Sequence, residues 1–439
     1  MFDILEESRR EYPYAVEIRR HLHENPEPSG VEFETVAYIT AQLRKLNIPF
    51  VSIPDGGILA TVDSGKPGKT VLLRADCDAL RMQELDHNAK QAKVCVSRNP
   101  GIAHTCGHDS HTAMLLAAGE ILMRHLDAFE GKILLLFERG EEGGMCIYYV
   151  MKYIQTQKIP IDGCYSNHVT ADFPAGTIGI ANGPTNAALF SFDVELHGEG
   201  GHGSRPDRAN NPIHCFLAIM ERMNDYRIRC TDPFKPLTFD VCSLHAGSAD
   251  NVIPDTLRFS GTARYFDRRL GDAFRDYLKR VIDSSAELYG CGMEYRKFIV
   301  GSLPVVTEPH CSALARKAAL RYLPETQVRV REPRLGSETF SVLTAYYPGA
   351  RGVIGARNEE AGIIYNNHHP GFEIDECGLI TGTMMYAAYA LEFLADKTDI
   401  TYEPFPGDID AMFKSMNAPV PERHDATHFN QKNEEETTP

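Results

Sequence analysis

The sequence predicts an α/β protein in which a mainly parallel-sheet domain carries an inserted, smaller α+β domain. The first observation is a series of short segments that are apolar throughout and alternate with helical segments: residues 57–62, 70–76, 132–137 and 164–169. Such strands are typical of a parallel sheet that is covered on both faces. The second observation is a change of pattern past Gly183, where strands become apolar on one face only.

Helices are expected between these strands. Ser29 and Glu32 have the spacing of a capping box, and apolar residues then recur at helical spacing up to Leu46. Further helices are predicted over 113–126 and around 148–154. The ends of the parallel strands are where ligands bind in such folds.

The inserted domain is expected at 184–302. Its first strand, 188–198, alternates apolar and polar residues, which indicates one face in solvent. A helix, two strands, a long helix and a last strand follow, at 211–226, 237–247, 255–266, 272–290 and 293–301. This β-α-β-β-α-β order is the split βαβ, or ferredoxin-like, motif.

The first pattern then returns, with helices expected at 312–323 and 381–395 and a strand at 351–356. The larger domain is therefore discontinuous, with parts at 1–183 and 303–400. Residues 401–439 are polar and end in QKNEEETTP, so we expect a solvated tail without a chemical role.

Composition limits the functional class. A chain of 439 residues, 43% of them hydrophobic, can bury a large core, and it contains no apolar run of the roughly 18 residues that a membrane helix needs. The eleven scattered cysteines are interpreted as reduced thiols, which together with the absence of a signal-peptide pattern suggests the cytoplasm. A net charge of −15 argues against binding to nucleic acid or to anionic membranes.

Four short stretches carry residues suited to metal chemistry. They are HTCGHDSHT with Cys106 and His108, FERGEEGG with Glu141 and Glu142, CYSNHV with His168, and YNNHHPGF with His368. Taken singly, each is more often an ordinary core or loop segment. All four follow an apolar strand, so the fold would bring them to one edge of the sheet.

Thiolate, imidazole and carboxylate groups together form a ligand set for zinc-class ions. A rival interpretation makes Cys106 a nucleophile with a histidine base. It leaves the paired glutamates and His368 without a role.

The motifs resemble those of the M20 metallopeptidase family, in particular its amidohydrolase branch of indole-acetyl-amino-acid hydrolases, hippurate hydrolases and aminoacylases. The resemblance extends from RRHLHENPEPSGVEF near residue 19 to HHPGFEIDE at Glu376. It rests on the order and spacing of RADCDAL, HTCGHDSHT, the EEGG pair, GGHGSRP, NVIPD and GSETF.

The resemblance implies roles for individual residues. Two divalent metal ions, with zinc, manganese, cobalt or nickel all compatible, would be bound by Cys106, His108, Glu142, His168 and His368. Glu141 would be the general base and acid, and Asp76 would orient the site. His202 would stabilise the oxyanion from across a homodimer interface, and Asn251 and Arg264 would hold the substrate's carbonyl and carboxylate groups.

Several positions depart from the family pattern. Thr339 stands where aspartate is common, and FERG replaces the common FQPA. His369, directly after the expected ligand, raises the alternative that His368 and His369 exchange roles. Arg81, Arg205 and His369 are further candidates for reshaping the substrate pocket.

These observations lead to the hypothesis of a dimeric, two-metal amidohydrolase that cleaves N-acyl-amino acids into a carboxylic acid and a free amino acid. One alternative is a dipeptidase or metallocarboxypeptidase with the same machinery. Another is a metal-free binding scaffold. Neither a nucleic acid nor a membrane is an expected partner.

Overall fold

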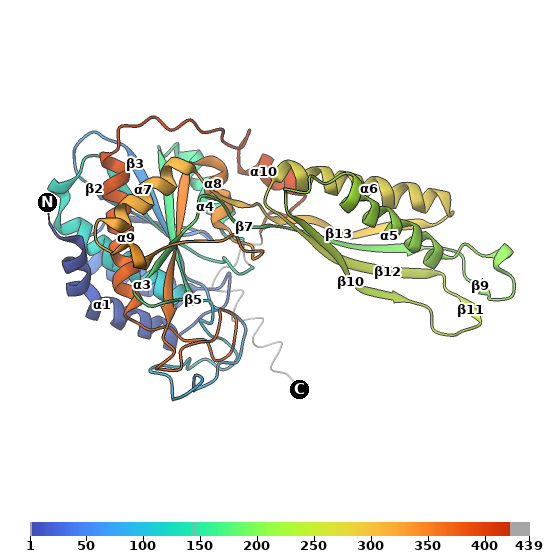
Figure 1. Ribbon diagram of the computed structural model, residues 1–439, viewed down its shortest axis with the longest axis horizontal. Coiled ribbons are helices and arrows are strands. Elements are labelled where there is room, and N and C mark those ends of the chain that lie inside the picture. The colour runs from blue at the N-terminus through green and yellow to red at the C-terminus, as the bar shows by residue number, and fades with distance from the viewer. Residues whose placement is uncertain (1, 144, 422–439) are drawn as a thin grey trace.

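An eight-stranded sheet forms the centre of the larger domain in the computed structural model, which describes residues 2–143 and 145–421 (Figure 1). Its order is β1 (Phe50–Ile53), β2 (Gly57–Asp63), β4 (Lys132–Glu138), β3 (Thr70–Asp76), β5 (Gly163–Pro174), β16 (Gly349–Arg357), β6 (Ile178–Ile180) and β15 (Val328–Val330).

Strand direction in this sheet agrees with the predicted fold class. β3 is parallel to β4 and β5, β5 is parallel to β16, and β6 is parallel to β15. The pairs β1–β2, β2–β4 and β16–β6 are antiparallel. The mainly parallel sheet is therefore confirmed, with antiparallel additions that the apolar runs did not reveal.

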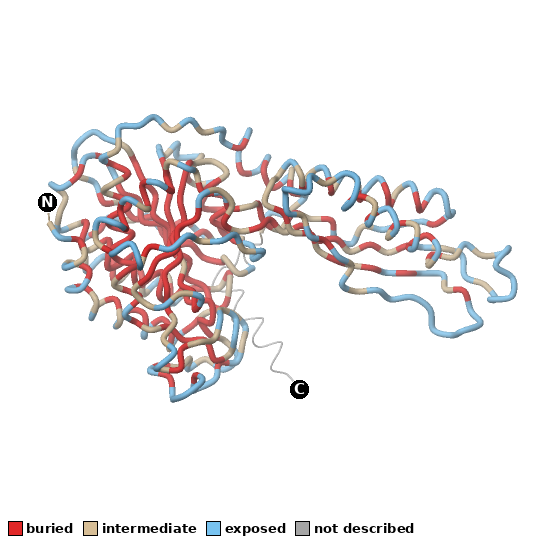
Figure 2. Tube along the Cα trace, in the orientation of Figure 1, coloured by how far each residue is buried: buried red, intermediate tan, exposed pale blue. Residues whose placement is uncertain are grey.

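Helices cover the sheet, and the buried part of the chain lies at its centre (Figure 2). The helices of the larger domain are α1 (Ile4–Glu24), α2 (Phe33–Lys45), α3 (His108–Arg124), α4 (Ile147–Gln157), α7 (Pro309–Leu320), α8 (Phe340–Tyr346) and α9 (Gly378–Ala395). A further helix, α10 (Ile409–Met416), packs on α4. Short 3-10 turns lie at Leu126–Ala128 and Glu325–Gln327 in the larger domain and at Pro206–Arg208 in the insertion.

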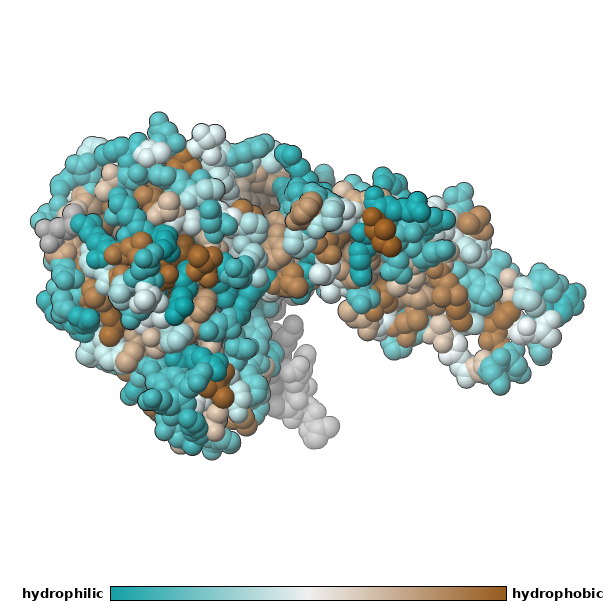
Figure 3. Space-filling view, viewed as in Figure 1, coloured by the Kyte–Doolittle hydropathy of each residue, from teal (hydrophilic) through white to brown (hydrophobic). Residues whose placement is uncertain are grey.

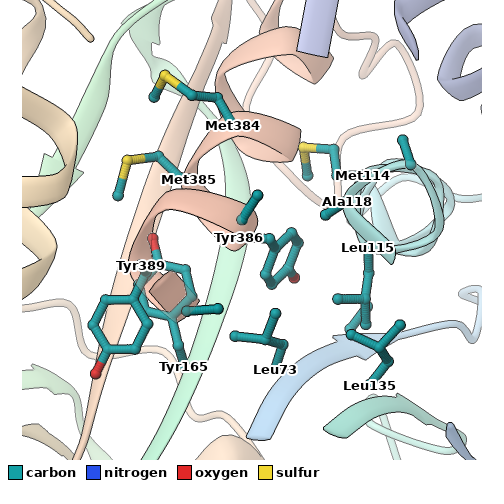
Figure 4. Packing of buried hydrophobic residues seen from close by; sticks show 14 of the residues in the cluster. Leu73, Met114, Leu115, Ala118, Leu135, Tyr165, Met384, Met385, Tyr386 and Tyr389 are labelled. Atoms are coloured by element: carbon teal, nitrogen blue, oxygen red, sulfur yellow. The ribbon is translucent and has the colours of Figure 1, made fainter. Parts of the chain in front are cut away.

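The core between α3, α9 and the strands β3, β4 and β5 is closely packed (Figure 4). The rings of Tyr165 and Tyr389 stack with centroids 4.3 Å apart. Gly382 on α9 lies so near Met114 on α3 that a Cβ atom there would be 1.8 Å from the methionine sulfur. The two helices thus pack closely because one contact position has no side chain.

The expected start of α2 is wrong. α2 begins at Phe33, and the Glu32 side chain makes no capping hydrogen bond to the helix. Glu32 is buried and instead accepts hydrogen bonds from Arg139 Nε at 2.8 Å and from the backbone N–H groups of Gly30 and Gly140. Glu32 therefore makes these hydrogen bonds in place of the expected capping box.

The expected solvated tail is wrong for residues 409–416. They form α10, whose Ile409, Met412, Phe413 and Met416 are buried. Phe413 contacts the ring of Tyr148 on α4, with centroids 4.9 Å apart. The final residues, 422–439, lie outside the described residues.

The insertion has the predicted β-α-β-β-α-β order. It consists of β8 (Ala188–His197), α5 (Pro212–Arg229), β10 (Leu237–Ala246), β12 (Thr256–Tyr265), α6 (Arg268–Leu288) and β13 (Gly292–Ser302), in an antiparallel sheet of order β10-β12-β8-β13.

Short strand pairs mark the two ends of the insertion. β7 (Gly183–Asn186) and β14 (Val305–Thr307) pair where it joins the larger domain, while β9 (Gly201–His202) and β11 (Val252–Ile253) pair at its far tip (Figure 1). Within residues 2–143 and 145–421, no helix combines the length and apolar character that crossing a membrane requires. None of the cysteines in this part of the chain is in a disulfide.

Candidate metal centre and active site

The turn that leads into α3 brings a thiol and an imidazole close to β5. Gly107 lies between Cys106 and His108 with a φ of 92°, a conformation that favours glycine. A Cβ atom on Gly107 would be 2.3 Å from a methyl group of Val169. Glycine is thus required both for the turn and for the close approach of the two segments.

The predicted ligands form one cluster. The Sγ atom of Cys106 is 3.5 Å from Nε2 of His168 and 3.2 Å from Nε2 of His368. Oε1 of Glu142 is 3.1 Å from Nε2 of His368 and 3.9 Å from Nε2 of His108. All five expected ligands therefore meet at one place, although they come from segments far apart in the chain.

Within this cluster the donor atoms form overlapping groups in which all members lie within 4.8 Å of one another. The groups are Cys106, His108 and His168; Cys106, Glu142 and His368; and His108, Glu141 and Glu142. Because Cys106 and Glu142 each belong to two groups, the arrangement suits adjacent ions that share a ligand.

Two atoms of the cluster are buried and make no hydrogen bond within residues 2–143 and 145–421: Nε2 of His108, and Oε1 of Glu142, which is within ion-pair distance of His368. Buried polar atoms in native proteins almost always have a partner, because leaving one unpaired costs about 1–3 kcal/mol. A cation between them would remove this cost. The sulfur, nitrogen and oxygen donors also match the ligand types of zinc and related ions.

Neighbouring groups hold the ligands in place. Nδ1 of His108 is 2.9 Å from Oδ1 of Asp78, and the other oxygen of Asp78 accepts a hydrogen bond from the backbone N–H of Glu142 at 2.8 Å. Nδ1 of His168 contacts the Val169 carbonyl at 2.7 Å. Such bonds fix the ring orientation of metal-binding histidines and leave Nε2 free.

Asp76, expected to orient the site, makes different contacts. Its carboxylate is 2.5 Å from Nδ1 of His111 and accepts a hydrogen bond from Arg74 at 2.7 Å. Oδ2 lies 3.7 Å from Nε2 of His108. Asp78 and His111 are thus supporting residues that sequence reasoning missed, although both lie in motifs that it had singled out.

Glu141 lies beside the cluster and accepts a hydrogen bond from the backbone N–H of Thr339 at 3.1 Å. Burial, with the nearby carboxylates of Glu338 and Glu142, raises the pKa of Glu141 well above its usual range. Burial also raises the pKa of the Cys106 thiol well above its usual range. The Sγ atom of Cys106 lies within reach of His168 and His368 in the candidate ligand groups, so the geometry favours Cys106 as a ligand.

The two adjacent histidines of NNHHP point to different partners. His368 has a φ of 66°, rare for a residue with a side chain, and its N–H donates to the Thr105 carbonyl at 2.8 Å. The ring of His369 stacks on Tyr365 with centroids 4.0 Å apart. The exchange of roles between the two histidines is therefore not supported by the geometry.

A cavity of about 350 Å³ opens beside the ligand cluster. Arg264, from β12 of the insertion, lines it together with Glu141 and the ligands Cys106, Glu142, His168 and His368. Nη1 of Arg264 is buried and has no hydrogen-bond partner in the described part of the chain. The structure thus brings one expected substrate-binding residue to the metal-ligand cluster.

His202 and Asn251 lie elsewhere. They line a separate cavity of about 850 Å³ at the tip of the insertion, where His202 in β9 pairs with Val252 in β11. Figure 1 shows this tip at the end of the insertion that is remote from the larger domain. Within one chain these two residues do not meet the metal-ligand cluster.

The expected pocket-shaping residues do not line the main cavity. Arg81 is exposed, and Arg205 donates to the neighbouring Asp207 at 2.8 and 2.6 Å. The cavity is lined instead by three arginines that sequence reasoning missed: Arg331, Arg334 and Arg351. They lie in stretches without a recognisable motif, and only the fold brings them together.

Comparisons with known proteins agree with this geometry. Peptidase family M20/M25/M40 matches residues 72–392. The chain is 34% identical to thermostable carboxypeptidase 2 of Saccharolobus solfataricus over 87% of this chain and 95% of that one. It is 32% identical to N-acetyl-L-cysteine deacetylase of Bacillus subtilis, over 83% and 84% of the two chains. A dinuclear metal-binding M20 peptidase of Bacillus subtilis superposes with a TM-score of 0.73 at 25% identity, covering 88% of this chain and 99% of that one.

Proposed function

The chain belongs to peptidase family M20/M25/M40, and we propose that within this hydrolase family it is a two-metal amidohydrolase acting on N-acyl-amino acids. The observation that carries the proposal is a single cavity that joins the Cys106, His108, Glu142, His168 and His368 cluster to Glu141 and to the unpaired guanidinium of Arg264.

Each group has a task in amide hydrolysis. Divalent ions held by the cluster would polarise the scissile carbonyl and make water acidic enough to supply a nucleophile near neutral pH. Glu141 accepts the proton of the attacking water and returns it to the leaving nitrogen, a task suited to a carboxylate whose pKa is raised. Arg264 binds the free carboxylate of the amino acid, because a guanidinium can donate to both oxygens.

A second copy of the chain would complete the site. His202 and Asn251 lie together at the tip of the insertion and line no part of the cavity at the metal-ligand cluster. In the homodimer that we propose, the tip of one subunit reaches the cavity of its partner, where His202 donates a hydrogen bond to the oxyanion.

The surface of the insertion is consistent with such an interface. β10 is at the edge of its sheet and pairs only with β12 in the described part of the chain. Leu244 on β10 is 49% exposed, and Figure 3 shows hydrophobic surface on the sheet side of the insertion. An open, partly apolar strand edge is a surface that a second copy can cover.

The alternative function is peptide hydrolysis, because one relative is named a carboxypeptidase. A dipeptide would place an ammonium group in the cavity, and that group needs a free carboxylate. Apart from Glu141 and Glu142, the carboxylate that lines the cavity is Glu338, which already pairs with Arg74 and Arg351. This favours a neutral or anionic acyl group over an α-amino group.

The test compares N-acetyl-L-methionine with L-alanyl-L-methionine, using metal-loaded wild type and Glu141→Gln. The proposal predicts faster cleavage of the acetyl compound, and a kcat about 10²–10⁴-fold lower in the variant at unchanged metal content. Faster cleavage of the dipeptide would favour the peptidase. If neither compound nor other N-acyl-amino acids were cleaved at all, the proposed activity would be wrong.

A further inference from the structure

Four arginines line the cavity beside the metal-ligand cluster, and they come from both domains. Arg264 is on β12 of the insertion, Arg331 and Arg334 follow β15, and Arg351 is on β16. One arginine is enough to bind the α-carboxylate of an amino acid. The other three therefore need a separate explanation.

The carboxylates near these arginines do not balance their charge. Arg331 and Arg334 both pair with the single carboxylate of Asp172. Arg351 pairs with Glu338, which also pairs with Arg74 outside the cavity lining.

Arg264 has no ion pair among residues 2–143 and 145–421. Glu141 and Glu142 also line the cavity, but they belong to the candidate metal site. Among the described residues, the four arginines have only Asp172 and Glu338 as ion-pair partners, and Glu338 is shared with Arg74. The four guanidinium groups therefore carry more positive charge than their own ion-pair partners neutralise.

Several donors of this wall also lack a partner. Nη1 of Arg264 and the Nε atoms of Arg331 and Arg351 are buried and make no hydrogen bond to any residue that the structure describes. The side chains of Arg331 and Arg351 are only 9% and 4% exposed. Burial and the like charge of Arg351 lower the pKa of Arg331 to about 10. Unpartnered buried donors and a lowered arginine pKa are both expected of cations that an anion in the cavity would stabilise.

The rest of the lining does not suit a large apolar group. Apart from its histidines, the part of the cavity wall that the structure describes has no ring, and Val169 and Val353 are its branched apolar side chains. An aromatic acyl group would have few apolar contacts there. A second anionic group of the substrate would instead meet the arginine N–H donors that lack a partner.

We propose that the preferred amide substrate carries two anionic groups, one bound by Arg264 and the other by Arg331 and Arg334. This inference rests on the proposed amidohydrolase function and narrows its substrate class. The second anion is a carboxylate either on the side chain of the amino acid or at the end of a dicarboxylic acyl group. Both sources present the same chemistry to the arginines.

The experiment uses two pairs of amides that differ only in that carboxylate. N-acetyl-L-glutamate is compared with N-acetyl-L-glutamine, and N-succinyl-L-alanine with its terminal amide. We expect kcat/KM of wild type to be about 10- to 100-fold higher for the charged member of one pair, the size of effect for a charge-assisted hydrogen bond. The pair that shows this preference identifies the source of the second carboxylate.

The matched variants are Arg334→Gln and Arg329→Gln. Arg329 is exposed on β15, does not line the cavity, and lies only five residues before Arg334. Arg334→Gln should remove the preference for the charged amide, measured as the ratio of kcat/KM for the charged and the neutral member of a pair. Arg329→Gln should leave this ratio and both kcat/KM values unchanged. Arg331→Lys keeps the charge at the more buried position and provides a second variant if Arg334→Gln folds poorly.

Binding separates this inference from the proposed activity. The affinity of metal-loaded protein for L-glutamate and L-glutamine, and for succinate and succinamate, is measured by calorimetry whether or not the amides are cleaved. Tighter binding of a charged member, lost in Arg334→Gln, supports the arginine subsite even if hydrolysis fails. Equal binding and turnover of the charged and neutral members in both pairs would overturn the inference. An equal loss of the preference for the charged member in Arg329→Gln would also overturn it.

Discussion

At the scale of single residues, the neighbouring His368 and His369 provide a matched comparison. The His368 ring contacts Cys106 and Glu142, whereas the His369 ring stacks on Tyr365. We expect His368→Ala to weaken divalent-metal binding by at least about 100-fold, because removing a ligand costs more than removing its hydrogen-bond partner. His369→Ala should retain its metal. Metal content after dialysis checks both variants, and a larger loss in His369→Ala would contradict the assignment.

A buried charge network next to the first turn of α3, where His23 contacts Asp109, gives a further prediction for a single residue. Oε1 of Glu84 is 2.9 Å from Nε2 of His23 and 2.8 Å from Nζ of Lys93. Burial by itself would raise the pKa of Glu84, but the hydrogen bonds and charges of His23 and Lys93 lower it to about 2. A lowered carboxyl pKa stabilises the fold above the unfolded-state pKa, and this contribution is lost as the pH falls towards 2.

Accordingly, Glu84→Gln should destabilise the metal-free protein at pH 7 by about 3 kcal/mol, and this difference should shrink as the pH falls below about 4. Urea unfolding of chelated wild type and variant at several pH values measures it. Glu130→Gln, at an exposed position, is the control and should show little change. A deficit of the same size at all pH values would show that the Glu84 effect is not electrostatic.

Residue types and their order were enough to indicate the cluster of Cys106, His108, Glu142, His168 and His368. The expectation that each follows a strand is wrong for His168, which lies within β5. The supporting contacts were less predictable. Both Asp76 and Asp78 lie in RADCDAL, and sequence spacing does not reveal which carboxylate is hydrogen-bonded to Nδ1 of His108. That distinction depends on the direction of side chains at the end of β3.

At the scale of elements, the close packing of α3 against α9 depends on Gly382. A Cβ atom there would overlap the sulfur of Met114, which is fully buried. We expect Gly382→Ala to lower the free energy of unfolding by about 1–3 kcal/mol through overpacking. Chemical denaturation measures this. In the double variant with Met114→Ala the two losses should be less than additive, whereas additive losses would show that the helices do not meet at this pair.

Helices and strands with a clear hydrophobic periodicity were predicted well, as the β-α-β-β-α-β order of the insertion shows. No helix was predicted over α1, which contains Pro13, a residue type that normally ends a helix. Pro13 is on the exposed side, where the carbonyl that loses its hydrogen bond can bind water. The start of α2 was misplaced because Glu32 pairs with Arg139, a residue 107 positions later in the chain.

At the scale of the whole molecule, the arrangement of His202 relative to Glu141 predicts complementation between subunits. If the tip of one subunit completes the cavity of its partner, Glu141→Gln and His202→Ala homodimers are both nearly inactive. Mixing them under conditions that exchange subunits should restore about one quarter of wild-type activity, because half of the dimers are mixed and each has one intact site. Mixtures no more active than their components would indicate that the site is completed within one chain.

The position of the insertion's tip relative to the metal-ligand cluster was the feature that the sequence predicted least. The apolar alternation of β8 predicts a sheet with one wet face, but it contains no information on how far the tip lies from the metal-ligand cluster. Arg264 and His202 are both in the insertion, yet only Arg264 lines the main cavity. The motifs predicted that both residues act at the same site, but in one chain the fold places them in different cavities.

The most direct test of the account is the metal content of protein purified without chelator and then reconstituted with zinc or manganese, measured by elemental analysis for wild type and His108→Ala. The account predicts about two divalent ions per chain in wild type and a clear loss in the variant, whose missing ring belongs to two of the ligand groups. Wild-type protein that binds no divalent ion even after reconstitution would contradict the two-metal mechanism.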